Sequence, residues 1–145
     1  MEQLSPHFTL SELTHTNTGL PNVPDSEETA RLQLLAEFME KVRAILGDGP
    51  ISVNSAFRTK TVNAAVHGVS NSAHRFAYAC DFTCSSFGSP YQVCVALDVA
   101  QKEGRIAFDQ LIQEGTWTHI SRDPKLREQR WTKTNGGYEI GIRPS

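Results

Sequence analysis

Two histidines and one aspartate are the residues of this sequence best suited to hold a metal ion. Asp81 follows His74 by seven positions, and His119 stands later in the chain, two positions from both Trp117 and Ser121. Two neutral imidazoles and one carboxylate provide three ligands and one negative charge, which suits a zinc ion that keeps a fourth position open for water. A zinc ion held in this way lowers the pKa of that water and polarises a carbonyl group. The chemistry that these three residues predict is hydrolysis.

The residues alone leave other ligand sets open. Two histidines and a carboxylate can also hold non-haem iron for oxygenase chemistry. In that class the first histidine and the carboxylate usually lie close together on one strand, whereas six residues separate them here, so iron is less favoured. His67 is also available as a ligand. A lone histidine is commonly a surface or core residue, and Asp81 could simply cap or pair within the fold.

The helices that must position these residues have clear start signals. A helix of about five or six turns is predicted over 25–47, because Glu28 completes a capping box and apolar residues recur at helical spacing. A second helix is predicted over 89–104, where Ser89 can cap and Pro90 takes the first helical position. A short helix is expected over 59–68.

The metal ligands fall on predicted strands and on a loop. The strands cover residues 51–55, 77–84, 108–113 and 116–121, and a hairpin is formed by 131–134 and 138–142. Turn-like residues 69–73 deliver His74 from a loop. Because side chains alternate along a strand, Asp81 shares a face with Ala79 and Thr83, and His119 shares one with Trp117.

This order of elements is typical of an α+β domain. We expect a single domain over residues 1–145, with a small antiparallel sheet and helices packed on it. The later strands are expected to be antiparallel because their connections are short. Residues 1–24 are predicted to be an ordered arm rather than part of the core, and 122–145 a C-terminal tail or hairpin.

The composition excludes several classes of function. The sequence is 39% apolar and 21% charged, and no segment approaches the ~20 apolar residues that span a bilayer, so no membrane partner is expected. Fourteen basic and sixteen acidic residues leave a formal charge of −2 without a basic cluster, which argues against nucleic acid. The three cysteines match neither a zinc ribbon nor a redox pair and are predicted to be buried free thiols. The start lacks a secretory signal, so we expect the protein to be cytoplasmic at synthesis. We also expect it to be a monomer.

A series of short motifs runs through the chain in a recognisable order. They are Ser55-Ala56-Phe57-Arg58, Asn63, Gly68 to His74, Ala79-Cys80-Asp81-Phe82, Phe108 to Glu114, and Trp117 to Ser121. This series resembles the zinc D-alanyl-D-alanine carboxypeptidase family, one of the LAS metallopeptidases, whose members include peptidoglycan-cleaving phage lysins. Ser5 to Leu13 also resembles the opening of the smaller phage-type members. The resemblance implies the LAS fold, which is the hedgehog and D-Ala-D-Ala peptidase fold.

The same resemblance implies a role for each site residue. It makes His74, Asp81 and His119 the ligands of one zinc ion per chain. Arg58 would bind a substrate carboxylate or carbonyl, a role that suits the guanidinium group because it can donate two parallel hydrogen bonds. The resemblance further gives Asn63, Ser72 and Trp117 to the substrate site. Trp117 could stack on sugar or peptide at the rim of the cleft or pack in the core beneath His119.

Two departures from the family pattern bear on activity. The family's general base is a Glu three residues before the last His, a position held here by Thr116. Glu114, five residues before His119 across a turn at Gly115, is the base that we favour, and Asp109 is the other candidate. The run Phe76-Ala77-Tyr78 also replaces a smaller family segment, and we expect it to narrow or reshape the cleft.

These observations lead to a zinc-dependent peptidase that hydrolyses peptide bonds of bacterial peptidoglycan. It would be a carboxypeptidase or an endopeptidase, lysin-like and phage-encoded, delivered to the wall or carried in the virion. The alternative is a non-catalytic module that binds the wall or serves in the virion, and that retains the fold and the zinc. Arg127 and Arg130 could attract an anionic wall or belong to a solvated tail.

Overall fold

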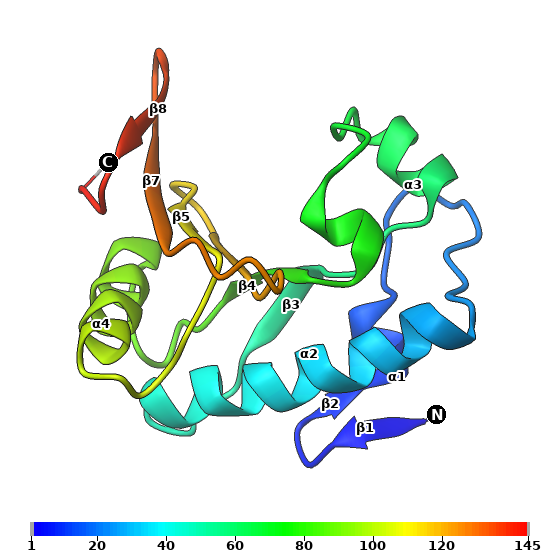
Figure 1. The fold of residues 1–145 in the computed structure, drawn as a ribbon, viewed down its shortest axis with the longest axis horizontal. Coiled ribbons are helices and arrows are strands. Elements are labelled where there is room, and N and C mark those ends of the chain that lie inside the picture. The colour runs from blue at the N-terminus through cyan, green and yellow to red at the C-terminus, as the bar shows by residue number, and fades with distance from the viewer. Residues whose placement is uncertain (1, 145) are drawn as a thin grey trace.

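A six-stranded sheet lies at the centre of the computed structural model, which describes residues 2–144 (Figure 1). Its strands are β3 (Ser52–Ser55), β4 (Ala79–Thr83), β5 (Gln110–Gln113), β6 (Thr118–Ser121), β7 (Gln129–Thr134) and β8 (Gly137–Ile140). Their order across the sheet is β3-β4-β6-β5-β7-β8. Helices accompany this sheet, so the predicted α+β class is confirmed.

The prediction of an antiparallel sheet is wrong at one pair, because β7 runs parallel to β5. The reason lies in the edges that remain free. Strand β6 is already flanked by β4 and β5, so the next strand cannot pair with β6, and it adds on the far side of β5. Residues 122–128 return the chain toward that side, and since β6 runs antiparallel to β5, a strand that reverses direction after β6 must run parallel to β5.

The three main helices begin at the predicted residues. Helix α2 (Ser26–Ile45) is preceded by Asp25, whose side chain accepts from the backbone of Glu28 in a capping box. Thr59 caps α3 (Lys60–Ala65), and Ser89 caps α4 (Pro90–Lys102). Side-chain oxygens thus satisfy helix-terminal N–H groups that would otherwise lack partners.

The prediction that residues 1–24 stay outside the core is wrong for their first half. This segment forms β1 (Gln3–Ser5), β2 (Phe8–Thr9) and α1 (Leu10–Leu13), and Leu4, Phe8 and Leu13 are buried in the main core. Leu13 also accepts a backbone hydrogen bond from Phe57, at 2.9 Å. These three residues therefore belong to the core, because β1, β2 and α1 pack against α2.

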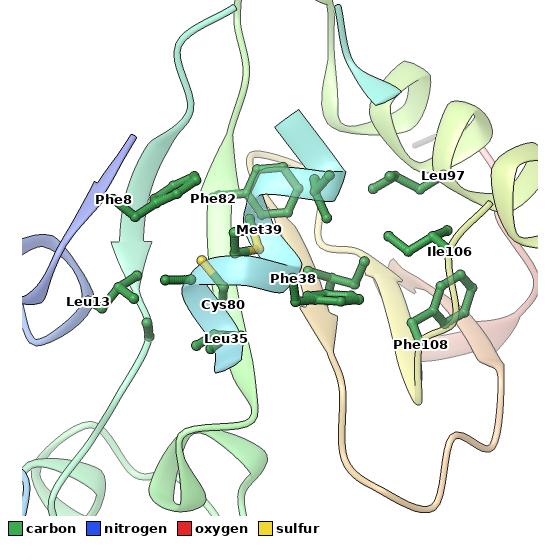
Figure 2. Close-up of a cluster of buried hydrophobic side chains, with 14 of the residues drawn as sticks. Phe8, Leu13, Leu35, Phe38, Met39, Cys80, Phe82, Leu97, Ile106 and Phe108 are labelled. Atoms are coloured by element: carbon green, nitrogen blue, oxygen red, sulfur yellow. The ribbon is translucent and has the colours of Figure 1, made fainter. Parts of the chain in front are cut away.

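The core fills the space between the sheet and the helices α2 and α4. Figure 2 shows Leu35 and Met39 of α2 close to Cys80 and Phe82 of β4. All three cysteines are buried and free, as predicted, and burial raises the pKa of the Cys94 thiol to about 12. Alternation along β4 turns Cys80 and Phe82 to the core and leaves the intervening Asp81 on the other face.

The face of the sheet that carries Asp81 is bordered by the β7–β8 hairpin and the segment around α3. In Figure 1 helix α2 runs along one side of the sheet, while the β7–β8 hairpin and the segment around α3 project on the opposite side. Among residues 2–144 there is no helix with the length and apolar character needed to cross a membrane.

Candidate metal centre

Strand pairing brings two of the three predicted ligands together. Asp81 of β4 and His119 of β6 are direct partners in the antiparallel register. Directly opposed residues project from the same face of a sheet, so their side chains meet. The His119 Nδ1 lies 2.8 Å from the Asp81 Oδ1. The other His119 ring nitrogen has no hydrogen-bond partner among residues 2–144.

A short 3-10 helix, η1 (Ala73–Phe76), supplies the third ligand, where a loop was expected. The Ser72 side chain caps η1 by accepting from the backbone of His74, at 3.3 Å. The His74 Nδ1 lies 2.7 Å from the carbonyl oxygen of Ala56, which holds the ring in one orientation. The other nitrogen, Nε2, is thereby directed to the Asp81 Oδ1, at 3.2 Å.

The spacing of these donors fits a zinc ion. One donor atom from each of the three residues can be chosen so that all lie within 4.8 Å of one another, and all three side chains are buried. Tetrahedral zinc with bonds of ~2.0–2.1 Å places neighbouring ligands about 3.3 Å apart. The observed separations of 2.8 and 3.2 Å are close to that value. His67, the other ligand considered, is exposed and stands outside this group.

The protonation states also fit a cation. Burial lowers the pKa of His74, which keeps its imidazole neutral and able to coordinate. Burial by itself would raise the pKa of Asp81, but the neighbouring His74 and His119 outweigh it and hold that pKa below its usual range. His74 therefore offers a neutral imidazole and Asp81 a carboxylate anion, which are the forms of these groups that bind zinc.

Arg58 lies next to this group and is held by two polar neighbours. Its guanidinium approaches the Asp81 Oδ2 to 3.8 Å, donates to the Ser55 Oγ at 3.3 Å, and donates to the Asn63 Oδ1 at 3.5 Å. Asn63 is buried behind Arg58 and donates to the carbonyl oxygen of Val69 at 2.8 Å. Burial lowers the pKa of Arg58, although the charge of Asp81 opposes that effect. Asn63 thus orients Arg58 and does not itself line the cavity.

A cavity of about 490 Å³ opens over the three ligands, and its lining includes Arg58, Ser72, Glu114, Trp117 and Tyr138. Glu114 reaches it through the sheet register. Ile112 is paired with His119 across β5 and β6, and Glu114 lies two residues further along on the same face. Its backbone N–H bonds to the carbonyl of Trp117 at 3.0 Å, which closes the turn.

Asp109, the second candidate for the general base, forms an ion pair with Arg127. Its carboxylate accepts three hydrogen bonds from Arg127, of which two come from the guanidinium at 2.9 and 2.7 Å. Although burial acts in the opposite direction, these bonds lower the pKa of Asp109. Glu114 has no ion-pair partner among the described residues, whereas Asp109 is engaged on both oxygens.

Two expectations about flanking residues are wrong. Arg127 and Arg130 do not belong to a solvated tail, because Arg127 binds Asp109 and Arg130 binds Asp98 of α4. Phe76 and Tyr78 do not narrow the cleft, since neither ring lines the cavity. The two rings lie 6.4 Å apart between centroids, with Arg75 close to Phe76 and Arg31 close to Tyr78.

Ala77, the residue between these two rings, has a backbone conformation that is uncommon for alanine. It ends η1 with φ 61, in the left-handed region that glycine adopts most easily, and its side chain is buried. The chain therefore makes this turn with alanine where glycine would adopt the conformation more easily.

Trp117 lines the cavity together with residues of the β7–β8 hairpin. The ring of Trp117 is half-buried, and the Lys133 Nζ lies 5.8 Å from its centroid. The Nε1 of Trp117 is buried without a hydrogen-bond partner in the described part of the chain. From the hairpin, Lys133 and Tyr138 line the cavity. The hairpin itself was predicted, but no sequence signal marked these side chains as part of a site.

Comparisons with known proteins agree with this geometry. The family model described as Peptidase M15 matches residues 6–121. Among characterised proteins, the zinc D-Ala-D-Ala carboxypeptidase of Streptomyces albus G is 34% identical over 100 residues. That alignment covers 68% of this chain but only 38% of the relative, so the chain matches well under half of the relative's length. The family match ends at Ser121, which leaves β7 and β8 outside it.

Proposed function

The chain belongs to the peptidase M15 family, and from this premise we propose that it is a zinc-dependent peptidase acting on the peptide part of bacterial peptidoglycan. The observation that carries the proposal is that His74, Asp81 and His119 cluster closely enough to hold one metal ion, and that Glu114 lines the same cavity. The name of the relative suggests that the bond cleaved lies next to a D-Ala residue. The same proposal includes cleavage of intact cell wall, as a lysin performs it.

The proposed ligands for zinc are His74, Asp81 and His119. When bound, the ion supplies a Lewis acid that polarises the scissile carbonyl and makes a water molecule more acidic. The hydrogen bond between His74 and the carbonyl of Ala56 keeps the imidazole oriented for coordination. Burial of the three donors strengthens their electrostatic interactions.

Glu114 is the proposed general base, because its carboxylate faces the cavity without a cation partner. It would accept a proton from the attacking water and pass it to the amine that leaves. Arg58 is the proposed binding group for a substrate carboxylate or carbonyl, since it lines the same cavity and is oriented by Asn63. A terminal carboxylate bound by Arg58 corresponds to a carboxypeptidase, and a carbonyl bound there corresponds to an endopeptidase.

The test is cleavage of purified peptidoglycan and of a pentapeptide ending in D-Ala-D-Ala, with one equivalent of zinc and after chelation. Release of free D-Ala would identify a carboxypeptidase, and new amino groups within the wall would identify an endopeptidase. Glu114→Gln should lower turnover by about 10²–10⁴-fold without loss of zinc. Glu139→Gln is the matched control, because Glu139 is exposed on β8 and pairs with Arg143.

A non-catalytic module is the second candidate, and the observation in its favour is Thr116 at the position of the family's usual base. Zinc bound by the wild-type protein without any cleavage of either substrate would support that candidate and overturn the peptidase. Equal turnover by the wild type and Glu114→Gln would instead retain the peptidase and remove Glu114 as its base.

A further inference from the structure

The β7–β8 hairpin lies outside the segment that the family shares, yet it forms part of the cavity wall. Lys133 on β7 and Tyr138 on β8 are direct partners in the antiparallel register. Directly opposed residues project from the same face of a hairpin, and both side chains line the cavity over the metal ligands. The hairpin therefore brings a phenol group to a site whose metal ligands come from other elements.

Tyr138 contacts the site through one hydrogen bond. Its hydroxyl donates to the Glu114 Oε1, with 2.9 Å between the two oxygens. Tyr138 is about half exposed, and its partial burial together with the nearby Glu114 carboxylate raises the pKa of Tyr138 to about 12. The hydroxyl therefore keeps its proton at neutral pH and remains a donor to the carboxylate.

Glu114 has few other restraints. Its backbone closes the turn with Trp117, and the next residue is Gly115, in a left-handed conformation with φ 93. Within the described residues, the Tyr138 bond is the hydrogen bond that restrains the Glu114 carboxylate. A bond to one carboxylate oxygen restricts rotation of the group and leaves the other oxygen free to accept a proton.

We propose that Tyr138 is a positioning residue that holds the Glu114 carboxylate in place to act as general base. This inference rests on the proposed function, because it requires that Glu114 take a proton during hydrolysis. It goes beyond that proposal by adding to the active site a residue from the hairpin, which the family match does not cover. Since Tyr138 acts through Glu114, its removal should slow the chemical step and leave substrate binding by Arg58 unchanged.

The test is steady-state peptidase kinetics of Tyr138→Phe, which removes the hydroxyl and keeps the ring. We expect kcat to fall by about tenfold, as for loss of one hydrogen bond to a charged group, with KM unchanged. Tyr91→Phe is the matched control, because Tyr91 lies on α4 and does not line the cavity. Its kcat should equal that of the wild type.

A double-mutant cycle with Glu114→Gln separates positioning from general damage to the fold. If Tyr138 acts through Glu114, Tyr138→Phe should cause no further loss of kcat in the Glu114→Gln background. Equal losses in both backgrounds would overturn the inference, as would an unchanged kcat in the single variant, and in both cases the peptidase would stand. An inactive wild-type protein would overturn the proposed function and this role together.

Discussion

Asp81→Asn should remove most of the stabilisation that zinc gives to this fold. Asp81 is the one anion among the three ligands, and it accepts from the His119 Nδ1 and lies beside the His74 Nε2. Asparagine has nearly the same shape, so packing in the buried site is preserved. It lacks the negative charge and turns an N–H₂ group toward either the two histidines or Arg58.

The size of the effect follows from linkage between metal binding and folding. At a free zinc concentration 100 times Kd, binding to the native state alone adds about 2.7 kcal/mol to the free energy of unfolding. For a domain of this size that corresponds to about 5–10 °C in Tm. If the variant binds zinc 100-fold more weakly, the same concentration adds only about 0.4 kcal/mol, or about 1 °C.

The assay is thermal unfolding of chelated protein, with and without zinc at the same free concentration. Asp123→Asn serves as the control, because Asp123 lines the same cavity but does not belong to the metal group. Its zinc-dependent rise in Tm should match that of the wild type. A full rise in Asp81→Asn, or a lost rise in Asp123→Asn, would refute the assignment of Asp81 as a ligand.

Three further outcomes concern stability of the metal-free protein. Because burial lowers the pKa of His74, the unfolded chain takes up a proton below pH ~6.5 that the native state resists, so the free energy of unfolding from urea titrations should fall as the pH drops from 7.5 to 5.5; a flat profile would contradict the burial of a neutral His74. Ala77→Val should destabilise the protein by about 2 kcal/mol or more, since a β-branched residue is strained at φ 61; an unchanged urea midpoint would be inconsistent with that backbone. Phe8→Ala should cost about 3–5 kcal/mol in the same titration, whereas a loss below 1 kcal/mol would place the N-terminal segment outside the core.

The helix starts and two of the candidate metal ligands could be predicted because their signals are local. Asp25 and Glu28 form a capping box within four residues, and Ser89 precedes a proline that suits a first helical turn. The ligands His74 and Asp81 are close in sequence and lie in a recognisable motif. The structure adds the register that pairs Asp81 with His119, which spacing in the sequence does not determine.

The remaining features depend on contacts between distant segments. The parallel pairing of β7 with β5 follows from which sheet edge is free after β6 has paired on both sides, and no residue within β7 encodes it. Phe8 and Leu13 stand out as apolar anchors, but they come from elements too short to show a hydrophobic period, so the pattern does not predict that they join the main core. The bond from Tyr138 to Glu114 joins residues 24 positions apart, across a hairpin that the motifs do not include.

The alternation along β4 also determines which donor group faces the two histidines. Cys80, a soft sulfur donor, directly precedes the hard carboxylate of Asp81, but its side chain lies in the core on the opposite face of the sheet. Burial further raises the pKa of Cys80 well above its ordinary value, so this thiol stays protonated in the core. A slip of one residue in the pairing of β4 would exchange the two side chains and place a thiol, in place of the carboxylate, opposite His119. The register of β4 therefore determines that a hard oxygen donor joins the two histidines.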